Sequence, residues 1–338
     1  MVAALEEADW ALTEFGTADL GDKRRTERLV ELATVLGNRP QESLPHACDD
    51  PARLKAAYRF FGNEAIEPAA IVDSHVQATL ERVGAVERVL AVQDTTYLDW
   101  SAERAPALLV HTTLAFTPER VPLGLLAQQT WIRPPEEAGK RETRRDRPIA
   151  EKESQKWLTS LQAVCAAKER CPQTHFISVG DREADVYDLF VLERPAGVDL
   201  LVRAAQDRRV AEEDPAPQKL RAALAACPVA ATVQVAVPRQ GNRPARTATL
   251  AVRWRAVVLR PPKARTAEEL PEVTVWAVWA TEPAPPAGVE ALDWLLLTTV
   301  PLTTTEGALT CLAWYACRWG IDIRQPHYPH TQEHRCVA

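Results

Sequence analysis

Residues 174–190, THFISVGDREADVYDLF, place a short apolar run immediately before three acidic residues and one arginine. The apolar run is a predicted buried strand, and Asp181 follows at its carboxyl end. Because open α/β sheets bind ligands at the carboxyl ends of their strands, we expect Asp181 to be a metal ligand. The alternative is that Asp181 or Asp185 only caps the predicted helix Val186–Leu192.

Two other predicted strands also end in charged residues. The run RVLAVQDTTYLDW, residues 88–100, contains a buried strand that ends in Asp94, and a strand at residues 198–202 leads to Arg203. A helix is predicted at residues 151–170. The elements follow in the order three strands, helix, strand, helix, strand, and the first three strands are expected to form an antiparallel meander.

Shifts in composition divide the chain into several parts. A helical region precedes the first strand, and a region of alternating polar and apolar residues follows the strand that reaches Arg203. This alternation, with a turn signal at Gly241 and Asn242, predicts an inserted antiparallel β subdomain. The expected parts are residues 1–75, 76–207, 208–288, 289–323 and an aberrant tail, 324–338.

The composition indicates a globular protein, which we place in the cytoplasm. With 46% hydrophobic residues in a chain of 338, a large core can be buried. No apolar run reaches the roughly 18 residues of a membrane span, and the acidic start is unlike a signal peptide. Seven cysteines without a CxxC pair favour reduced thiols over a disulfide framework and argue against zinc.

Two basic clusters are candidate contacts for nucleic-acid phosphates, although a net charge of −6 argues against a wholly basic coat. Lys23, Arg24, Arg25 and Arg28 form the first cluster, and the second lies within residues 140–147. The alternative for either cluster is a solvated charged surface.

The last predicted helix, Thr305–Ile323, carries a third acidic candidate. Tyr315, Arg318 and Asp322 are spaced i, i+3 and i+7, so they share one face of this helix. Together with the two strand-end aspartates, Asp322 suits a site for two divalent cations. Mg²⁺ or Mn²⁺ is expected, because oxygen ligands without His or Cys favour hard cations. The alternative is an amphipathic helix with a surface Arg–Asp pair.

Five motifs occur along the chain in the order LGDKRRTERLV, VQDTTYLD, SVGDREADVYD, DWLLLTT and WYACRWGID. In these motifs the chain resembles the DDE transposases of bacterial insertion sequences, specifically the branch with a β subdomain inserted in its RNase H-like domain. The resemblance covers residues 8 to about 323. It implies an RNase H-like mixed sheet with flanking helices, an inserted antiparallel β subdomain and an N-terminal helical domain that binds DNA ends.

The resemblance also implies roles for individual residues. Asp94, Asp181 and Asp322 match the catalytic acids that hold two Mg²⁺ or Mn²⁺ ions in that family. The implied DNA-binding residues are Lys23, Arg24, Arg25, Arg28, Arg203, Trp294, Tyr315 and Arg318. Of these, Trp294 matches a tryptophan that stacks on a base flipped out of the duplex.

The sequence departs from the family pattern near its end. Asp322 stands where the family has Glu, and misplacing a metal ligand by about 1 Å can cost on the order of 10²-fold in rate. Pro326 and Pro329 prevent continuation of the last helix, and the family's C-terminal dimerisation helices have no counterpart. We interpret this as truncation by a frameshift, and we expect weak or no activity and no synaptic homodimer.

The predicted function is therefore that of a DDE transposase, impaired by truncation. It would act on double-stranded DNA, both transposon ends and target, by two-metal phosphoryl transfer that cleaves and then joins strands. One alternative is a non-catalytic, DNA-binding remnant that inhibits the full-length enzyme. Another is a stand-alone metal nuclease on the same fold. No membrane partner is expected.

Overall fold

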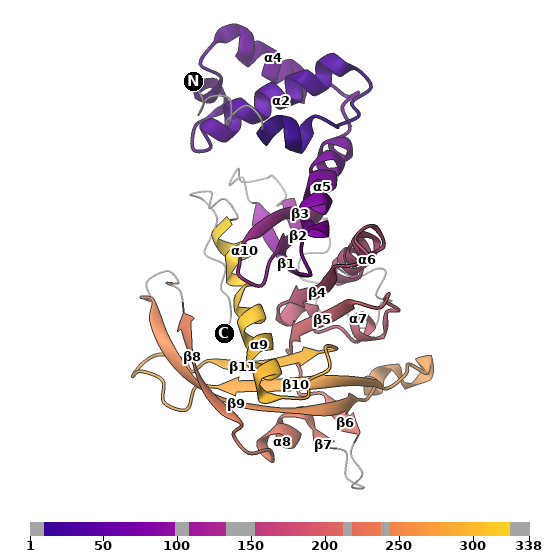
Figure 1. Ribbon diagram of the computed structural model, residues 1–338, viewed down its shortest axis with the longest axis vertical. Coiled ribbons are helices and arrows are strands. Elements are labelled where there is room, and N and C mark those ends of the chain that lie inside the picture. The colour runs from indigo at the N-terminus through magenta and orange to yellow at the C-terminus, as the bar shows by residue number, and fades with distance from the viewer. Residues whose placement is uncertain are drawn as a thin grey trace. The chain divides into compact units, whose positions relative to one another are not determined.

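The computed structural model describes residues 10–98, 108–132, 153–211, 218–237, 239 and 244–324. The chain forms two compact units, Met1–Ala85 and Val86–Ala338. The first unit is helical, and the second contains a mixed sheet with flanking helices (Figure 1). The prediction of a mixed α/β protein is thus confirmed.

Two of the helices of the first unit begin at a capping aspartate. The unit includes α2 (Lys23–Asn38), α3 (Leu44–Cys48), α4 (Pro51–Phe61) and α5 (Pro68–Gly84). Asp22 caps α2 by accepting a hydrogen bond from the Arg24 backbone N–H at 2.9 Å. Asp50 caps α4 in the same way, and Pro51 occupies a first-turn position where no N–H is needed.

The core of the first unit lies between α2 and α4. Leu29 and Leu32 of α2, at helical spacing, pack with Ala57 and Phe60 of α4, and Leu32 is only 1% exposed. Helix α5 belongs to this unit because Arg82 forms an ion pair with Glu14 at 2.7 Å.

One sheet runs through the second unit, and its first half has the predicted element order. The strands are β1 (Arg88–Leu98), β2 (Leu108–Phe116), β3 (Pro122–Ile132), β4 (His175–Gly180) and β5 (Val198–Arg203). They lie in the order β3-β2-β1-β4-β5. Strands β1 to β3 form the antiparallel meander, whereas β1, β4 and β5 are parallel neighbours.

The second half of the sheet continues beyond β5 in the order β11-β10-β9-β6-β7, with β8 paired to β9. Its strands are β6 (Arg209–Ala211), β7 (Gln218–Lys219), β8 (Ala231–Val237), β9 (Arg246–Leu259), β10 (Val273–Thr281) and β11 (Asp293–Thr298). Strands β8 and β9 pair as an antiparallel hairpin. The predicted turn at Gly241 and Asn242 lies outside the described residues.

Helices cover both faces of the sheet in the second unit. They are α6 (Gln155–Arg170), α7 (Tyr187–Val191), α8 (Leu220–Ala225), α9 (Thr305–Ala316) and α10 (Trp319–Arg324), with 3₁₀ turns η3 (Arg182–Ala184) and η4 (Lys263–Glu268). Leu90, Val92 and Val179 pack in one cluster with α9. Gly180 faces Trp157 of α6, on the opposite side of the sheet. Figure 1 shows α9 and α10 following one another past the strands.

The prediction of a single last helix over Thr305–Ile323 is wrong, because the chain tightens between α9 and α10. The backbone N–H groups of Cys317 and Arg318 bond to carbonyls three residues earlier instead of four. Gly320 then brings the chain against the Phe116 ring, where an added Cβ would lie 3.5 Å from a ring carbon. This break places Tyr315 in α9 and Asp322 in α10, two separate helices.

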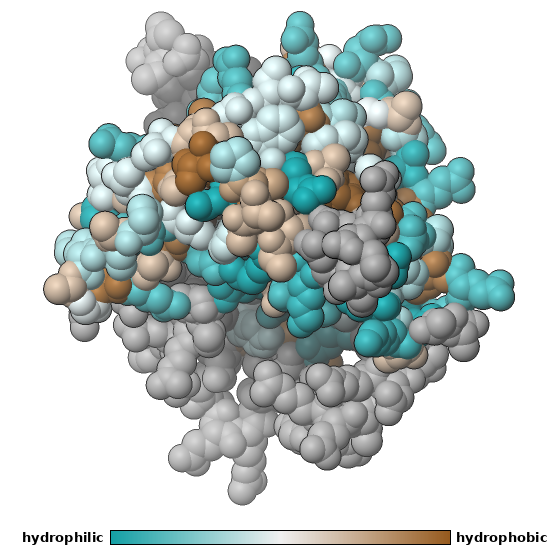
Figure 2. Space-filling view, turned by 90° about the horizontal axis from the view of Figure 1, so that it is seen from below, coloured by the Kyte–Doolittle hydropathy of each residue, from teal (hydrophilic) through white to brown (hydrophobic). Residues whose placement is uncertain are grey.

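The surface and the thiols show no membrane or disulfide feature within the described part of the chain. No described helix is long and apolar enough to cross a membrane. The six described cysteines are all free. In the face shown in Figure 2, hydrophobic residues occur as separate patches among hydrophilic ones, as on ordinary solvated surfaces.

Candidate active site and nucleic-acid interface

Strand register brings Asp94, Asp181 and Arg203 to the same level of the sheet. Val92 of β1 pairs with Val179 of β4, and Asp94 and Asp181 each follow two residues later. Val179 in turn pairs with a β5 residue that precedes Arg203 by two positions. Since side chains two residues apart share a face and adjacent strands are about 4.8 Å apart, these three residues form one row beside α9 and α10.

A tight turn holds the Asp181 carboxylate. Its Oδ1 accepts a hydrogen bond from the Glu183 backbone N–H at 2.8 Å, so Asp181 caps the 3₁₀ turn η3. The turn folds back over Gly180, where an added Cβ would lie 2.4 Å from the Ala184 Cβ. The alternative that Asp181 or Asp185 caps α7 is wrong, because the N-cap of α7 is Val186 and no side chain caps it.

The electrostatic surroundings of Asp181 favour a nearby cation. Burial raises the pKa of the Asp181 carboxyl above its usual value, and the negative charge of Glu183 adds to this. The hydrogen bond from the Glu183 N–H and the positive charges of Arg318 and Lys156 act in the opposite direction. A divalent ion would stabilise the ionised form that burial disfavours.

Arg318 lies beside both Asp94 and Asp181. The prediction that the first strand ends in Asp94 is wrong, because β1 continues to Leu98. The Arg318 Nη1 is 3.9 Å from Oδ1 of Asp94, a distance that allows electrostatic attraction but not a hydrogen bond. Arg318 also hydrogen-bonds Tyr315, whose pKa is raised by burial against the opposing charges of Arg318 and Arg203. The structure therefore brings together Asp94, Asp181, Arg203, Tyr315 and Arg318.

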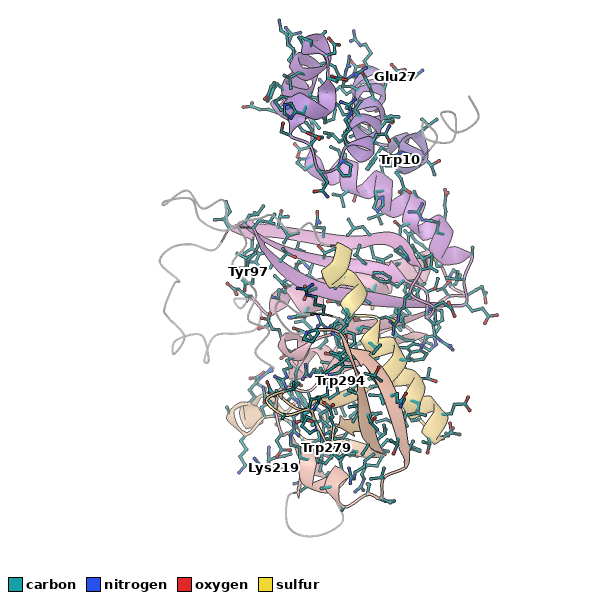
Figure 3. The ribbon with its side chains drawn as sticks, turned by 90° about the vertical axis from the view of Figure 1, so that its left-hand side faces the viewer. Trp10, Glu27, Tyr97, Lys219, Trp279 and Trp294 are labelled. Carbon is teal, nitrogen blue, oxygen red and sulfur yellow. The ribbon has the colours of Figure 1, made fainter. Side chains whose placement is uncertain are left out.

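Trp294 and Tyr315 are buried, which constrains their predicted contacts with DNA. Trp294 is 2% exposed and Tyr315 is 3% exposed. The Trp294 ring packs edge-on against the rings of Tyr315 and Trp319, with centroid distances of 5.3 and 5.4 Å. Figure 3 labels Trp294 among the side chains of the second unit. Stacking on an unpaired base would require the indole to leave this core.

Two donor nitrogens of Arg203 differ in their hydrogen bonding. Its Nη2 donates to the Asp293 carbonyl oxygen at 3.0 Å. Its Nε is buried and has no hydrogen-bond partner within the described part of the chain. Buried donors are almost always paired in folded proteins, so this Nε marks a place where an acceptor oxygen would be accommodated.

The proposed metal ligands are described only in part. Asp322 lies in α10, but its side chain is outside what the structure describes. No group of three or more His, Cys, Asp or Glu side chains suited to a metal lies among the described residues. Asp94 and Asp181 supply carboxylate oxygens on adjacent strands, which fits a hard cation such as Mg²⁺ or Mn²⁺ but makes an incomplete ligand set.

Asp185, four residues after Asp181, is fully engaged in internal contacts. Its carboxylate is 2.8 Å from Arg208 Nε and accepts backbone N–H groups of Ala205 and Gln206 at 2.8 and 3.0 Å. The side chains of Asp185 and Arg208 are 0% and 5% exposed. Asp185 therefore stabilises the segment after β5 by hydrogen bonds, and it is not a candidate metal ligand.

A buried polar network lies on the face of the sheet that α6 covers, and it was not predicted from the sequence. His111 on β2 is 2.9 Å from the Thr95 hydroxyl and 3.3 Å from Oε1 of Gln93. Gln93 donates to the Ser178 hydroxyl on β4 at 2.7 Å. Burial and the charge of Lys156 lower the pKa of His111 to about 3, so the ring is neutral. No local pattern identifies this network, because its members come from three strands.

The cations of α2 that were predicted to bind DNA are already engaged within the first unit. Lys23, Arg24 and Arg28 pair with acids at 3.5, 2.9 and 2.5 Å. Arg25 donates to the Leu20 carbonyl oxygen at 2.9 Å. Lys23 and Arg24 remain highly exposed, so these pairs are weak and can exchange for phosphate.

Helix α4 presents a second exposed basic surface, which the sequence reasoning did not single out. Tyr58 is 57% exposed and lies beside the exposed cations Lys55 and Arg59. These three line a shallow surface hollow of about 430 Å³ together with Pro51 and Leu54. Neither Lys55 nor Arg59 is within ion-pair distance of an acid among the described residues. The alternation of Lys, Tyr and Arg at i, i+3 and i+4 was the available signal.

Comparison with known families finds a similarity within the first unit. Residues 7–66 match the family model described as transposase DNA-binding. The match includes α2, α3 and α4, and therefore both basic surfaces. It supports a transposase that binds DNA, which is the coarser part of the functional prediction.

Proposed function

We propose that this protein is a DDE transposase of insertion-sequence type, with an RNase H-like catalytic domain. The observation that carries the proposal is the row of Asp94, Asp181 and Arg203 across three parallel neighbouring strands, beside Arg318. The match of residues 7–66 to a transposase DNA-binding family supports it independently. The two observations come from different units of the chain.

The strand order supports the RNase H-like assignment. A meander followed by two parallel strands, in the order β3-β2-β1-β4-β5, places Asp94 just past the parallel pairing of β1 with β4 and Asp181 at the carboxyl end of β4. On this interpretation, residues 208–288 are a β subdomain inserted between β5 and β11, and they extend the same sheet.

Each residue has a role that its surroundings support. Asp94 and Asp181, with Asp322 as the proposed third ligand, would hold Mg²⁺ or Mn²⁺. When bound, such ions supply a water or hydroxyl nucleophile and stabilise a leaving oxygen. Arg318 and the unpaired Nε of Arg203 would hold phosphate oxygens of the DNA beside the carboxylates.

Binding of the DNA end is assigned to the first unit. Lys55, Tyr58 and Arg59 on α4 add an exposed surface to the α2 cluster of Lys23 and Arg24. Cations on such surfaces contact phosphates, and an exposed aromatic ring adds apolar contact.

A non-catalytic DNA-binding protein is the second candidate. The observation that favours it is the break before α10, together with Asp in place of the family's Glu at position 322. Both changes act on the third proposed ligand, while the pair Asp94 and Asp181 is intact.

The decisive experiment incubates the full chain with double-stranded DNA that carries the terminal repeats flanking its coding sequence. Gel shift measures binding, and denaturing gels measure strand cleavage with Mg²⁺, Mn²⁺ or EDTA. The controls are Asp94→Ala and Asp181→Ala, which we expect to bind DNA but not to cleave it.

The outcomes separate the two candidates. Metal-dependent cleavage that both substitutions abolish would establish the transposase chemistry. Specific binding without cleavage under either metal would establish the non-catalytic candidate. Cleavage that persists in Asp181→Ala would refute the assigned site, and absence of specific binding would refute both candidates.

A further inference from the structure

Lys156, in the first turn of α6, carries a buried charge. Its side chain is 6% exposed, and its ammonium lies 5.9 Å from the ring centre of Trp131 and 5.5 Å from that of Trp157. A buried ammonium is costly unless it is paired. Its acidic partner is Glu183, whose Oε2 lies 2.9 Å from the Lys156 Nζ.

The position of Lys156 is fixed from the sheet. Gln129 of β3 donates from Nε2 to the Lys156 carbonyl oxygen and to the Ser160 hydroxyl, both at 2.9 Å. The neighbouring Trp157 packs edge-on against the buried His111 ring at 4.6 Å. The start of α6 is therefore anchored at two points, and the ammonium is a fixed charge.

Glu183 transmits this fixed position to Asp181. Its side chain is 59% exposed, so the ion pair with Lys156 is its main anchor in the described structure. Its backbone N–H donates to Oδ1 of Asp181 at 2.8 Å. The same turn is pressed over Gly180, where there is no room for a Cβ. Lys156, Glu183 and Asp181 thus form a continuous chain of contacts from α6 to the end of β4.

We propose that Lys156 is a positioning residue for Asp181, and that it acts by clamping the η3 turn through Glu183. Lys156 touches no substrate and holds no metal, because its ammonium faces Glu183 and two indole rings. The clamp keeps the Asp181 carboxylate aimed beside Asp94. The role of Asp181 as a metal ligand rests on the proposed function.

The test is a double-mutant cycle on Mn²⁺ affinity, measured by electron paramagnetic resonance on the full chain. Lys156→Met keeps the apolar stem and removes the charge, and Glu183→Gln changes an exposed group. We expect each to weaken Mn²⁺ binding roughly 10-fold, as loss of groups that orient metal ligands does. The double variant should be no weaker than the single ones. Lys168→Met, at the other end of α6, is the matched control and should leave the affinity unchanged.

A second measurement separates failure of the clamp from failure of the proposed function. Hydrogen exchange followed by mass spectrometry over residues 180–187 should speed up in Lys156→Met and in Glu183→Gln, but not in Lys168→Met. If the wild type binds no Mn²⁺ while exchange still responds in this way, the metal site fails and the clamp stands. Additive effects in the cycle, or exchange that responds to neither substitution, would overturn the clamp. Glu183→Gln decides the matter if Lys156→Met does not fold.

Discussion

Asp181 and Asp185 lie four residues apart in the same short stretch, but their carboxylates differ in burial and in hydrogen bonding. Asp185 has no exposed side-chain surface and gives its oxygens to Arg208 and to two backbone N–H groups. Asp181 accepts one backbone N–H and lies in one row with Asp94, beside Arg318. Acids with every lone pair satisfied hold the fold together, whereas an acid with remaining capacity can bind a ligand.

The largest effect on stability is expected for substitution of Asp185, whose carboxylate is fully hydrogen-bonded. Asp185→Ala leaves the buried Arg208 guanidinium without its partner, and we expect the free energy of unfolding to fall by about 3–5 kcal/mol. Urea denaturation measures this. Asp188→Ala is the matched control, because its partner Arg265 is 28% exposed and retains Glu268, so a loss of only about 1 kcal/mol is expected. Equal losses of unfolding free energy in the two variants would contradict this distinction between a buried and a partly exposed ion pair.

Acid should destabilise the protein through His111, another buried group with satisfied contacts. The pKa of His111 is lowered to about 3 in the folded chain, so the unfolded chain binds the proton more tightly. This contribution to stability is complete above about pH 6.5 and is lost as pH falls toward 3. The loss in the free energy of unfolding amounts to about 3 kcal/mol at pH 4. Denaturation between pH 7 and pH 4 measures it.

The matched variant for this test is His111→Gln, which cannot take up a proton. Its stability should fall less steeply with acid than that of the wild type. Identical slopes for the two proteins would show that the ring does not control the acid response.

For substitution of Asp181, which has unused hydrogen-bonding capacity, we expect a small change in stability and a large change in Mn²⁺ binding. Asp181→Asn keeps an acceptor for the Glu183 N–H, so the free energy of unfolding should change by less than about 1 kcal/mol. Mn²⁺ affinity should be lost, because an amide supplies no charge to the ion. Calorimetry and thermal melting on one sample report both quantities. Unchanged Mn²⁺ affinity would remove Asp181 from the site.

The smallest effects on stability are expected on the surface of the first unit, where the same contrast recurs. Lys55→Ala with Arg59→Ala, and Lys23→Ala with Arg24→Ala, should each change the free energy of unfolding by less than about 0.5 kcal/mol. The α4 pair should reduce the slope of log affinity for DNA against log salt by up to about 2, one for each phosphate contact.

The α2 pair should reduce that slope less, because its cations already have acidic neighbours at 3.5 and 2.9 Å. Titrations of DNA binding from low to physiological salt give both slopes. A larger loss from the α2 pair would show that its ion pairs open on binding and that α2 is the main contact.

The sequence by itself determined most of the local elements of the first half of the sheet and their order along the chain. Apolar runs predicted the strands β1, β4 and β5, although β1 continues beyond Asp94 to Leu98. These features depend on residues close together in the chain, where periodicity and capping act. The sequence also placed Asp94 and Asp181 after predicted apolar strand segments, but their in-register placement depends on the parallel pairing of β1 and β4.

Only the tertiary structure decided which polar groups are engaged and which remain open. Asp181 and Asp185 look alike in sequence, and their difference depends on Arg208, which reaches Asp185 from a distant segment. Lys156 finds its partner Glu183 across 27 residues, and the contact of Gly320 with Phe116 accompanies the break in the last helix. Burial of Trp294 is likewise a property of the packed core. Each of these depends on long-range contacts, which leave no local periodic signal.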